Sequence, residues 1–113
     1  MIKIISISIF LLLPLSAMAN ETCYLVGSFS ESALKSKTNK ISEKIFLEDT
    51  LKKLEAYKED FTYNEYRKMK LQIESVINKT YRDKTKQKLS DFDFSMYGVH
   101  WRLKCEKNQI RIY

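Results

Sequence analysis

The chain has 113 residues, 44% of them hydrophobic, and carries 20 basic against 14 acidic side chains, for a net charge of +6. That length leaves room for one small domain with a modest core, and two glycines are too few for a glycine-rich phosphate-binding loop. The basic balance favours an anionic partner, such as nucleic acid, anionic lipid or an acidic protein.

Residues 1–19 have the three regions of a secretory signal peptide. One basic residue, Lys3, precedes an apolar run at 4–15, and the Ala-Met-Ala segment at 17–19 supplies the small residues of a cleavage site. The apolar run is shorter than the roughly 20 residues that a membrane-spanning helix needs. We therefore expect cleavage after residue 19, a single helical domain at 20–113, no stable membrane insertion afterwards, and a periplasmic or secreted location.

The chain has two cysteines, Cys23 and Cys105, which stand near the two ends of this domain. An even number of cysteines in an exported chain predicts a disulfide. In the chain-entropy description, closing a loop this long contributes about 4–5 kcal/mol, a large share of the about 5–15 kcal/mol that stabilises a typical domain. Pairing also removes both thiols from zinc or redox chemistry, and their spacing is not that of a redox motif.

The first half of the domain predicts two helices. Within residues 20–34, apolar residues recur at intervals of three and four, as on one face of a helix. They are Cys23, Val26, Phe29 or Ser30, and Ala33. Gly27 interrupts this helix and permits a close approach to another helix. Residues 35–40 are polar and predict a loop. A second helix, capped by Ser42 or Thr38, is expected to reach about Tyr57. Its apolar stripe comprises Ile41, Ile45, Phe46 or Leu47, Leu51, Leu54, and Tyr57 or Lys58.

A third helix begins at a capping box formed by Thr62 and Glu65 and is expected to run to about Tyr81. One of its faces carries Tyr66, Met69, Ile73, Val76 or Ile77, and Thr80 or Tyr81. Residues 82–88 form a polar connector, and Ser90 or Asp91 is the expected cap of the segment that follows.

The last segment has two interpretations. A helical period is matched by Leu89, Phe92, Met96, Val99 and Leu103, whereas Val99, Trp101, Leu103 and Cys105 alternate as in a strand. The strand interpretation would continue through residues 107–109 into a hairpin. We favour the helix because Phe92 and Met96 extend its period. The predicted fold is all-α, a small antiparallel four-helix bundle whose first and last helices are joined by the disulfide. The alternative is three helices plus a C-terminal β-hairpin.

These landmarks resemble those of small exported single-disulfide helical proteins of the Gram-negative periplasm. The shared features are Cys23 at the start of the first helix, Ala33 within it, the aromatic end of the third helix at 76–81, and Trp101 followed by Cys105. The resemblance covers nearly all of residues 20–113 and rests on spacing. It implies an all-helical periplasmic protein, and it carries no assigned function. This chain departs from the pattern in being more basic.

The sequence offers no constellation for catalysis or for a metal. The chain has one histidine, His100, and no Gly-x-Ser-x-Gly turn that would present a nucleophile. Asp91 and Asp93 would diverge on a helix, and the further carboxylates and the glycine of a calcium-binding loop are missing around them, so they form no cation loop. We expect a protein that is not an enzyme and has no cofactor and no metal.

The residues most suited to contact a partner are basic or aromatic. The candidates are Lys79, Arg82, Lys84, Lys86 and Lys88 in and beside the connector, together with Tyr63, Tyr66 and Trp101. A solvated loop and a set of core aromatics are the alternative interpretations of the same residues. Outside the cytoplasm we expect another protein, of acidic character, as the partner and no nucleic acid.

The leading functional hypothesis is an exported non-enzymatic binding protein of the bacterial periplasm. An immunity or inhibitor protein against an envelope-targeting toxin or hydrolase is one form of it. The alternative is an acid- or stress-responsive chaperone-like protein. The sequence leaves the oligomeric state open.

Overall fold

The structure is a computed structural model that describes residues 14–84 and 88–112. Its helices are α2 (Pro14–Thr38), α3 (Glu43–Glu55), α4 (Tyr63–Arg82) and α5 (Asp91–Glu106), with a 3-10 turn η1 (Lys58–Asp60) after α3. No strand occurs within these residues, so the all-α prediction is confirmed and the hairpin alternative is wrong. Of the predicted leader, residues 1–13 lie outside the described residues, as does Lys86.

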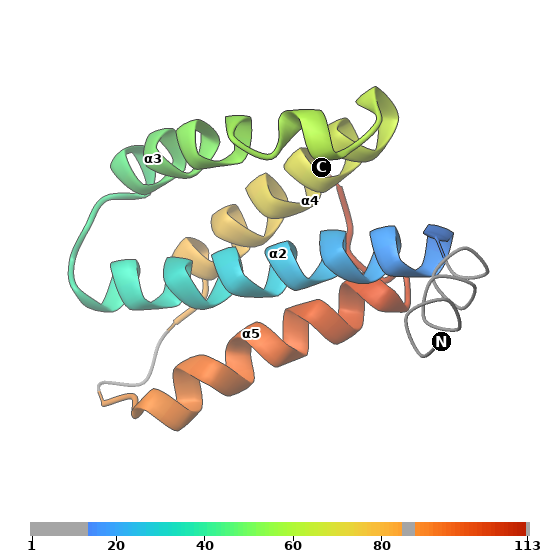
Figure 1. The fold of residues 1–113 in the computed structure, drawn as a ribbon. Helices are drawn as coiled ribbons and strands as arrows, with labels where there is room; N and C mark the ends of the chain where they lie inside the picture. The colour runs from blue at the N-terminus through green and yellow to red at the C-terminus, as the bar shows by residue number, and fades with distance from the viewer. Residues whose placement is uncertain (1–13, 85–87, 113) are drawn as a thin grey trace, which may run out of the picture.

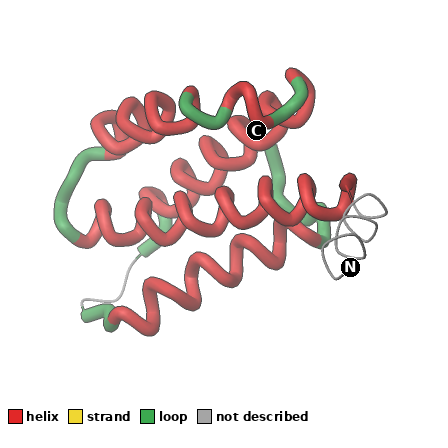
Figure 2. The backbone as a smooth tube through the Cα atoms, in the orientation of Figure 1, coloured by secondary structure: helices red, strands yellow, loops and turns green. Residues whose placement is uncertain are grey.

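Helix α2 is the central element of the bundle. It packs most extensively against α5 and next against α4, while α3 rests mainly on α4 (Figure 1). Successive helices alternate in direction, as in an antiparallel bundle (Figure 2). The disulfide joins Cys23 of α2 to Cys105 of α5, with their Cα atoms 5.4 Å apart, as predicted.

Hydroxyl side chains cap three of the four helices. The Ile45 amide donates to Ser42 Oγ at the start of α3 (3.2 Å). At α4 the Glu65 amide donates to Thr62 Oγ1 (3.2 Å), and the Thr62 amide donates back to the Glu65 carboxylate (2.8 Å). Those hydrogen bonds lower the pKa of Glu65 below its usual value. Ser90 caps α5 in a second capping box. The predicted starts of the last three helices are therefore confirmed.

The core lies where α2, α3 and α4 meet, with α5 covering the other side of α2. The predicted inward face of the first helix is confirmed, because Cys23, Val26, Ser30 and Ala33 are buried. The face of α4 is confirmed at Met69, Ile73, Val76, Ile77 and Thr80. The buried hydroxyls of Ser30 and Thr80 donate to carbonyls within their own helices, those of Val26 (2.6 Å) and Val76 (2.7 Å).

Two glycines let α2 and α5 touch backbone to backbone beside the disulfide. A Cβ built on Gly27 would lie 2.6 Å from the carbonyl oxygen of Gly98 and 2.9 Å from Cβ of Arg102. A Cβ on Gly98 would lie 2.9 Å from the Gly27 carbonyl oxygen. The close approach expected at Gly27 is thus confirmed, and Gly98 is its counterpart on α5.

Three features of the predicted helices are wrong. The predicted loop at 35–40 is helical as far as Thr38, because Lys37 is held against the end of α4. Of the stripe predicted for α3, Phe46 and Leu54 are buried as expected, but Ile41 and Ile45 are exposed, and Thr50 is buried although it was not predicted. The apolar period at Phe92, Met96 and Leu103 predicted the helix α5, but it marks the outer face of that helix and not its core face.

Helix α5 buries Gly98, Trp101 and Cys105, while Phe92, Met96 and Leu103 are exposed. Both faces of this helix are apolar, so periodicity detects the helix without selecting its inner face. The disulfide and the glycine contact make that selection.

We predict that Gly27→Ala destabilises the fold by about 1–3 kcal/mol, the usual cost of overpacking, because the methyl group meets backbone that cannot move aside. Ser28→Ala, at an exposed neighbouring position of the same helix, should change stability by no more than about 0.5 kcal/mol. Equilibrium denaturation of both variants measures the difference. A Gly27→Ala protein that is more stable by about 1 kcal/mol, as helix propensity alone would give, would contradict the close contact.

Candidate binding groove

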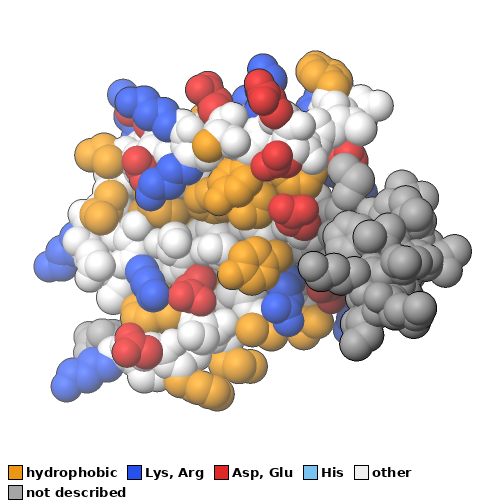
Figure 3. Space-filling view, viewed as in Figure 1, with side chains coloured by type: hydrophobic (Ala, Val, Ile, Leu, Met, Phe, Trp, Pro, Cys, Tyr) orange, Lys and Arg blue, Asp and Glu red, His pale blue; other side chains and the backbone are white. Residues whose placement is uncertain are grey.

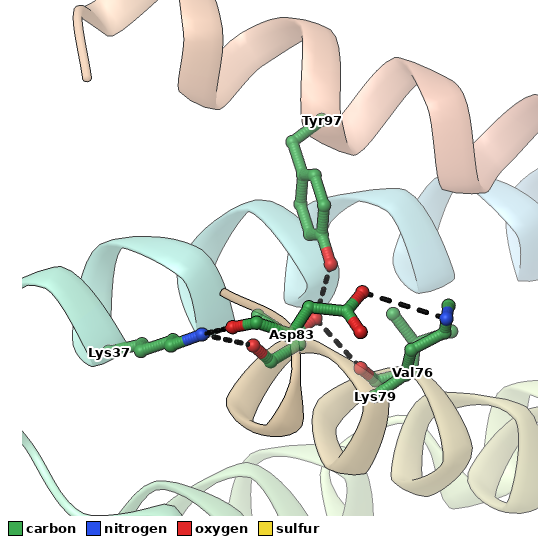
Figure 4. Close-up of polar contacts among 6 residues, drawn as sticks. Lys37, Val76, Lys79, Asp83 and Tyr97 are labelled. Atoms are coloured by element: carbon green, nitrogen blue, oxygen red, sulfur yellow. Dashed lines mark hydrogen bonds and ion pairs between the residues drawn. The ribbon is translucent and has the colours of Figure 1, made fainter. Parts of the chain in front are cut away.

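A hydrogen-bond network fixes the end of α4 to α2 and to α5 (Figure 4). Lys37 of α2 donates through Nζ to the Thr80 carbonyl at 2.8 Å and also to the Asp83 carbonyl. Thr80 Oγ1 and the Tyr97 hydroxyl of α5 lie 2.6 Å apart. A cation at a helix C-terminus is favourable because the free carbonyls there carry partial negative charge. The last turn of α4 is therefore held in place, together with Lys79 on it.

A surface groove of about 280 Å³ lies between this end of α4, the C-terminal half of α5 and the segment after α5. Its lining consists of Ser75, Val76, Lys79, Trp101, Lys104, Gln109, Ile110 and Arg111. The segment after α5 turns back toward α4 (Figure 1), where Ser75 Oγ donates to the Arg111 carbonyl. Three separate parts of the chain thus form the groove.

Every charged residue that lines the groove is basic: Lys79, Lys104 and Arg111. Lys79 lies 3.6 Å from the Asp83 carboxylate, and both side chains are half exposed, so the pair is weak. No ion pair involves Lys104 or Arg111 within the part of the chain that the structure describes. Among the described residues, Asp83 is therefore the carboxylate that offsets a groove cation, and only weakly, so the groove has a positive potential.

Trp101 forms the apolar wall of the groove and is only 6% exposed. Lys104 Nζ lies 5.7 Å from the centre of its ring, within cation–π range. Its buried indole Nε1 has no hydrogen-bond partner among the described residues. A buried donor without a partner typically costs about 1–3 kcal/mol, so an acceptor that reached this N–H would be stabilised.

The His100 imidazole lies edge-on to the Trp101 ring, with centroids 5.2 Å apart. Burial lowers the pKa of His100 below its usual 6.5, and the positive charge of Lys104 lowers it further. Burial and, to a smaller extent, the cation that lines the groove therefore both favour the neutral form of this imidazole.

The structure brings together two of the residues predicted to contact a partner, Lys79 and Trp101. Arg82, Lys84 and Lys88 are exposed at and beyond the end of α4, outside the groove lining. Trp101 is a buried wall of the groove, which agrees with the alternative interpretation of the aromatics as core residues rather than exposed anchors.

The two predicted tyrosines lie at the opposite end of α4. Tyr63 is 75% exposed and Tyr66 is partly buried. At 1.5 Å per residue, Tyr63 is roughly 24 Å along the helix from Lys79, so the tyrosines and the basic residues form separate surfaces. Sequence reasoning missed Lys104 and Arg111, because only the packing of α5 and the turn after it place them beside Lys79.

Within residues 14–84 and 88–112, no three His, Cys, Asp or Glu side chains are grouped so that they could bind a metal ion. Over the same residues, no helix combines the length and the apolar character needed to span a membrane. Comparison of the chain with known proteins gave no matching family model, no matching curated protein and no matching solved structure.

We predict that His100 titrates with a midpoint below pH 6.5. Well above that pH neither the folded nor the unfolded chain carries this proton. As the pH falls below 6.5 the unfolded chain binds the proton first, so stability decreases until the pH passes the lowered pKa of the folded state. The chain has one histidine, so its imidazole NMR signals are unambiguous. A midpoint at or above 6.5 would contradict the burial and the influence of Lys104, and His100→Gln should remove this part of the pH dependence of stability.

Proposed function

We propose that this chain is an exported, non-enzymatic binding protein of the bacterial periplasm that takes an acidic segment of a partner protein into the groove between α4 and α5. The observation that carries the proposal is the grouping of Lys79, Lys104 and Arg111 around the Trp101 wall without a lining carboxylate. Carboxylates bound to basic side chains make shorter and stronger hydrogen bonds than neutral groups do.

The dimensions and chemistry of the groove suit one or two side chains of a protein partner. An aspartate or glutamate would meet the three cations, while the apolar part of the same segment would pack on Val76, Trp101 and Ile110. A net charge of +6 would also speed the approach of an acidic surface. The groove therefore combines an apolar wall with a charged rim, as protein interfaces commonly do.

The predicted leader and the disulfide support an exported location, because disulfides persist outside the reducing cytoplasm. Within this function we favour an immunity or inhibitor protein that neutralises an envelope-targeting toxin or hydrolase. Such a role needs a small rigid surface and no catalytic group. The disulfide and the fixed end of α4 supply that rigidity.

Reversing charge in the groove tests this proposal. We expect Lys104→Glu/Arg111→Glu to weaken binding of a stoichiometric periplasmic partner at least about tenfold, because each charge-assisted contact typically contributes about 1.5–3 kcal/mol. Affinity capture from periplasmic extract followed by titration with the purified partner measures the change, and rising salt should weaken the wild-type complex.

The matched control is Lys44→Glu/Lys52→Glu, which makes the same change in net charge at exposed positions of α3. It should leave the affinity within about twofold, since only long-range attraction changes. Equal weakening by both variants would show that net charge alone governs binding, and the absence of a stoichiometric partner would contradict the proposal itself.

A further inference from the structure

The outer face of α5 carries an apolar stripe that the other described elements leave largely exposed, with Val99 half-buried at its edge toward α2. The outer stripe consists of Phe92, Met96, Val99 and Leu103, which recur at four, three and four residues and so share one face. Phe92 is 70% exposed, Met96 47% and Leu103 42%. In Figure 3, hydrophobic side chains gather along the lower edge, where Figure 1 places α5. Single exposed apolar residues are common, but a contiguous row on one helix is typical of an interaction surface.

Charge is distributed unevenly along this helix. The N-terminal end has two carboxylates, Asp91 and Asp93. The C-terminal end and the residue after it carry Arg102, Lys104 and Lys107 against one carboxylate, Glu106. Such a helix is complementary to a copy of itself that runs in the opposite direction, and it repels a copy that runs in the same direction.

We propose that the outer stripe is covered by the outer stripe of a second copy of this chain, with the two α5 helices antiparallel across a two-fold axis. An isologous contact of this kind pairs each residue with a different residue of the copy. With the axis between Met96 and Val99, Phe92 faces Leu103 of the second copy, and Met96 faces Val99 of the second copy. All four apolar side chains are then covered.

The same register brings opposite charges together beside the stripe. At 100° per residue, Asp91 and Arg102 lie on the same flank of the outer stripe. In the antiparallel pair that flank faces itself, so Asp91 lies beside Arg102 of the second copy. Arg102 also lies 3.9 Å from Glu106 within its own chain. In the dimer its guanidinium therefore lies between Glu106 of its own chain and Asp91 of the second copy.

This interface leaves the binding groove open. Trp101 lies on the buried side of α5, opposite the outer stripe, and the groove is built on that side together with α4. The dimer contact is therefore independent of the groove, and loss of one would not imply loss of the other.

Sedimentation velocity over a range of concentrations tests the dimer. The chain is produced with its own leader, exported and purified with its disulfide intact. We expect the wild type to pass from monomer to dimer as concentration rises, and Met96→Glu to raise the dissociation constant at least about tenfold, because it buries a charge at the centre of the contact. Tyr63→Glu, at an exposed aromatic position of α4, should leave the dissociation constant within about twofold, since surface positions outside the contact contribute little.

A charge exchange tests the antiparallel register. Asp91→Arg alone, and Arg102→Asp alone, should each weaken the dimer because both place like charges together twice in each dimer. The double variant restores the opposite pairing and should recover an affinity within about threefold of the wild type, as coupling between contacting residues requires.

Several results would overturn the inference. A wild-type monomer at every accessible concentration would do so, and so would a dimer that Met96→Glu does not weaken. A monomer that sediments with anionic lipid vesicles, and loses this binding in Met96→Glu, would assign the outer stripe to a membrane surface instead. If the double variant fails to recover affinity, although it and the two single variants keep the circular dichroism spectrum of the wild type, the antiparallel register is excluded.

Discussion

Helices α2 and α5 meet at a point where neither has a side chain. Gly27 and Gly98 place backbone against backbone about one turn from Cys23 and two turns from Cys105, and the disulfide prevents the two helices from separating there. Hydrophobic burial alone could not hold α5 in this orientation, because the helix is apolar on both sides. The covalent bond and the glycine contact instead determine its rotation about its own axis.

That rotation accounts for both surfaces described above. It directs Trp101 inward against α4, where Lys79 and Lys104 border it and the groove forms. It also turns Phe92 and Met96 outward, where they lack a partner within the described part of the chain. A rotation of about half a turn would bury the outer stripe and expose Trp101, and neither the cationic groove nor the dimer contact would exist. The core on the far side of α2 would be little affected.

Local signals in the sequence were sufficient for the presence of the four helices and for the starts of the last three, whereas α2 begins at Pro14, earlier than the pattern at 20–34 indicated. Ser42 and Thr62 cap because a hydroxyl can accept from an amide three residues ahead, and this requires no tertiary context. The extension of α2 to Thr38 was not predictable in this way, since it depends on Lys37 reaching the end of α4. The groove was partly predictable: Lys79 and Trp101 were recognised as residue types, but Arg111 joins them only through the turn after α5.

The central claim is that the Cys23–Cys105 bond holds α5 in register, and denaturation followed by Trp101 fluorescence tests it most directly. The chain has one tryptophan, and it lies on α5. For Cys23→Ser/Cys105→Ser the account predicts a loss of about 2–5 kcal/mol in the free energy of unfolding, together with a Trp101 emission shifted toward that of exposed indole before denaturant is added. A loss below about 1 kcal/mol with unchanged emission would show that packing alone positions α5 and would contradict the account.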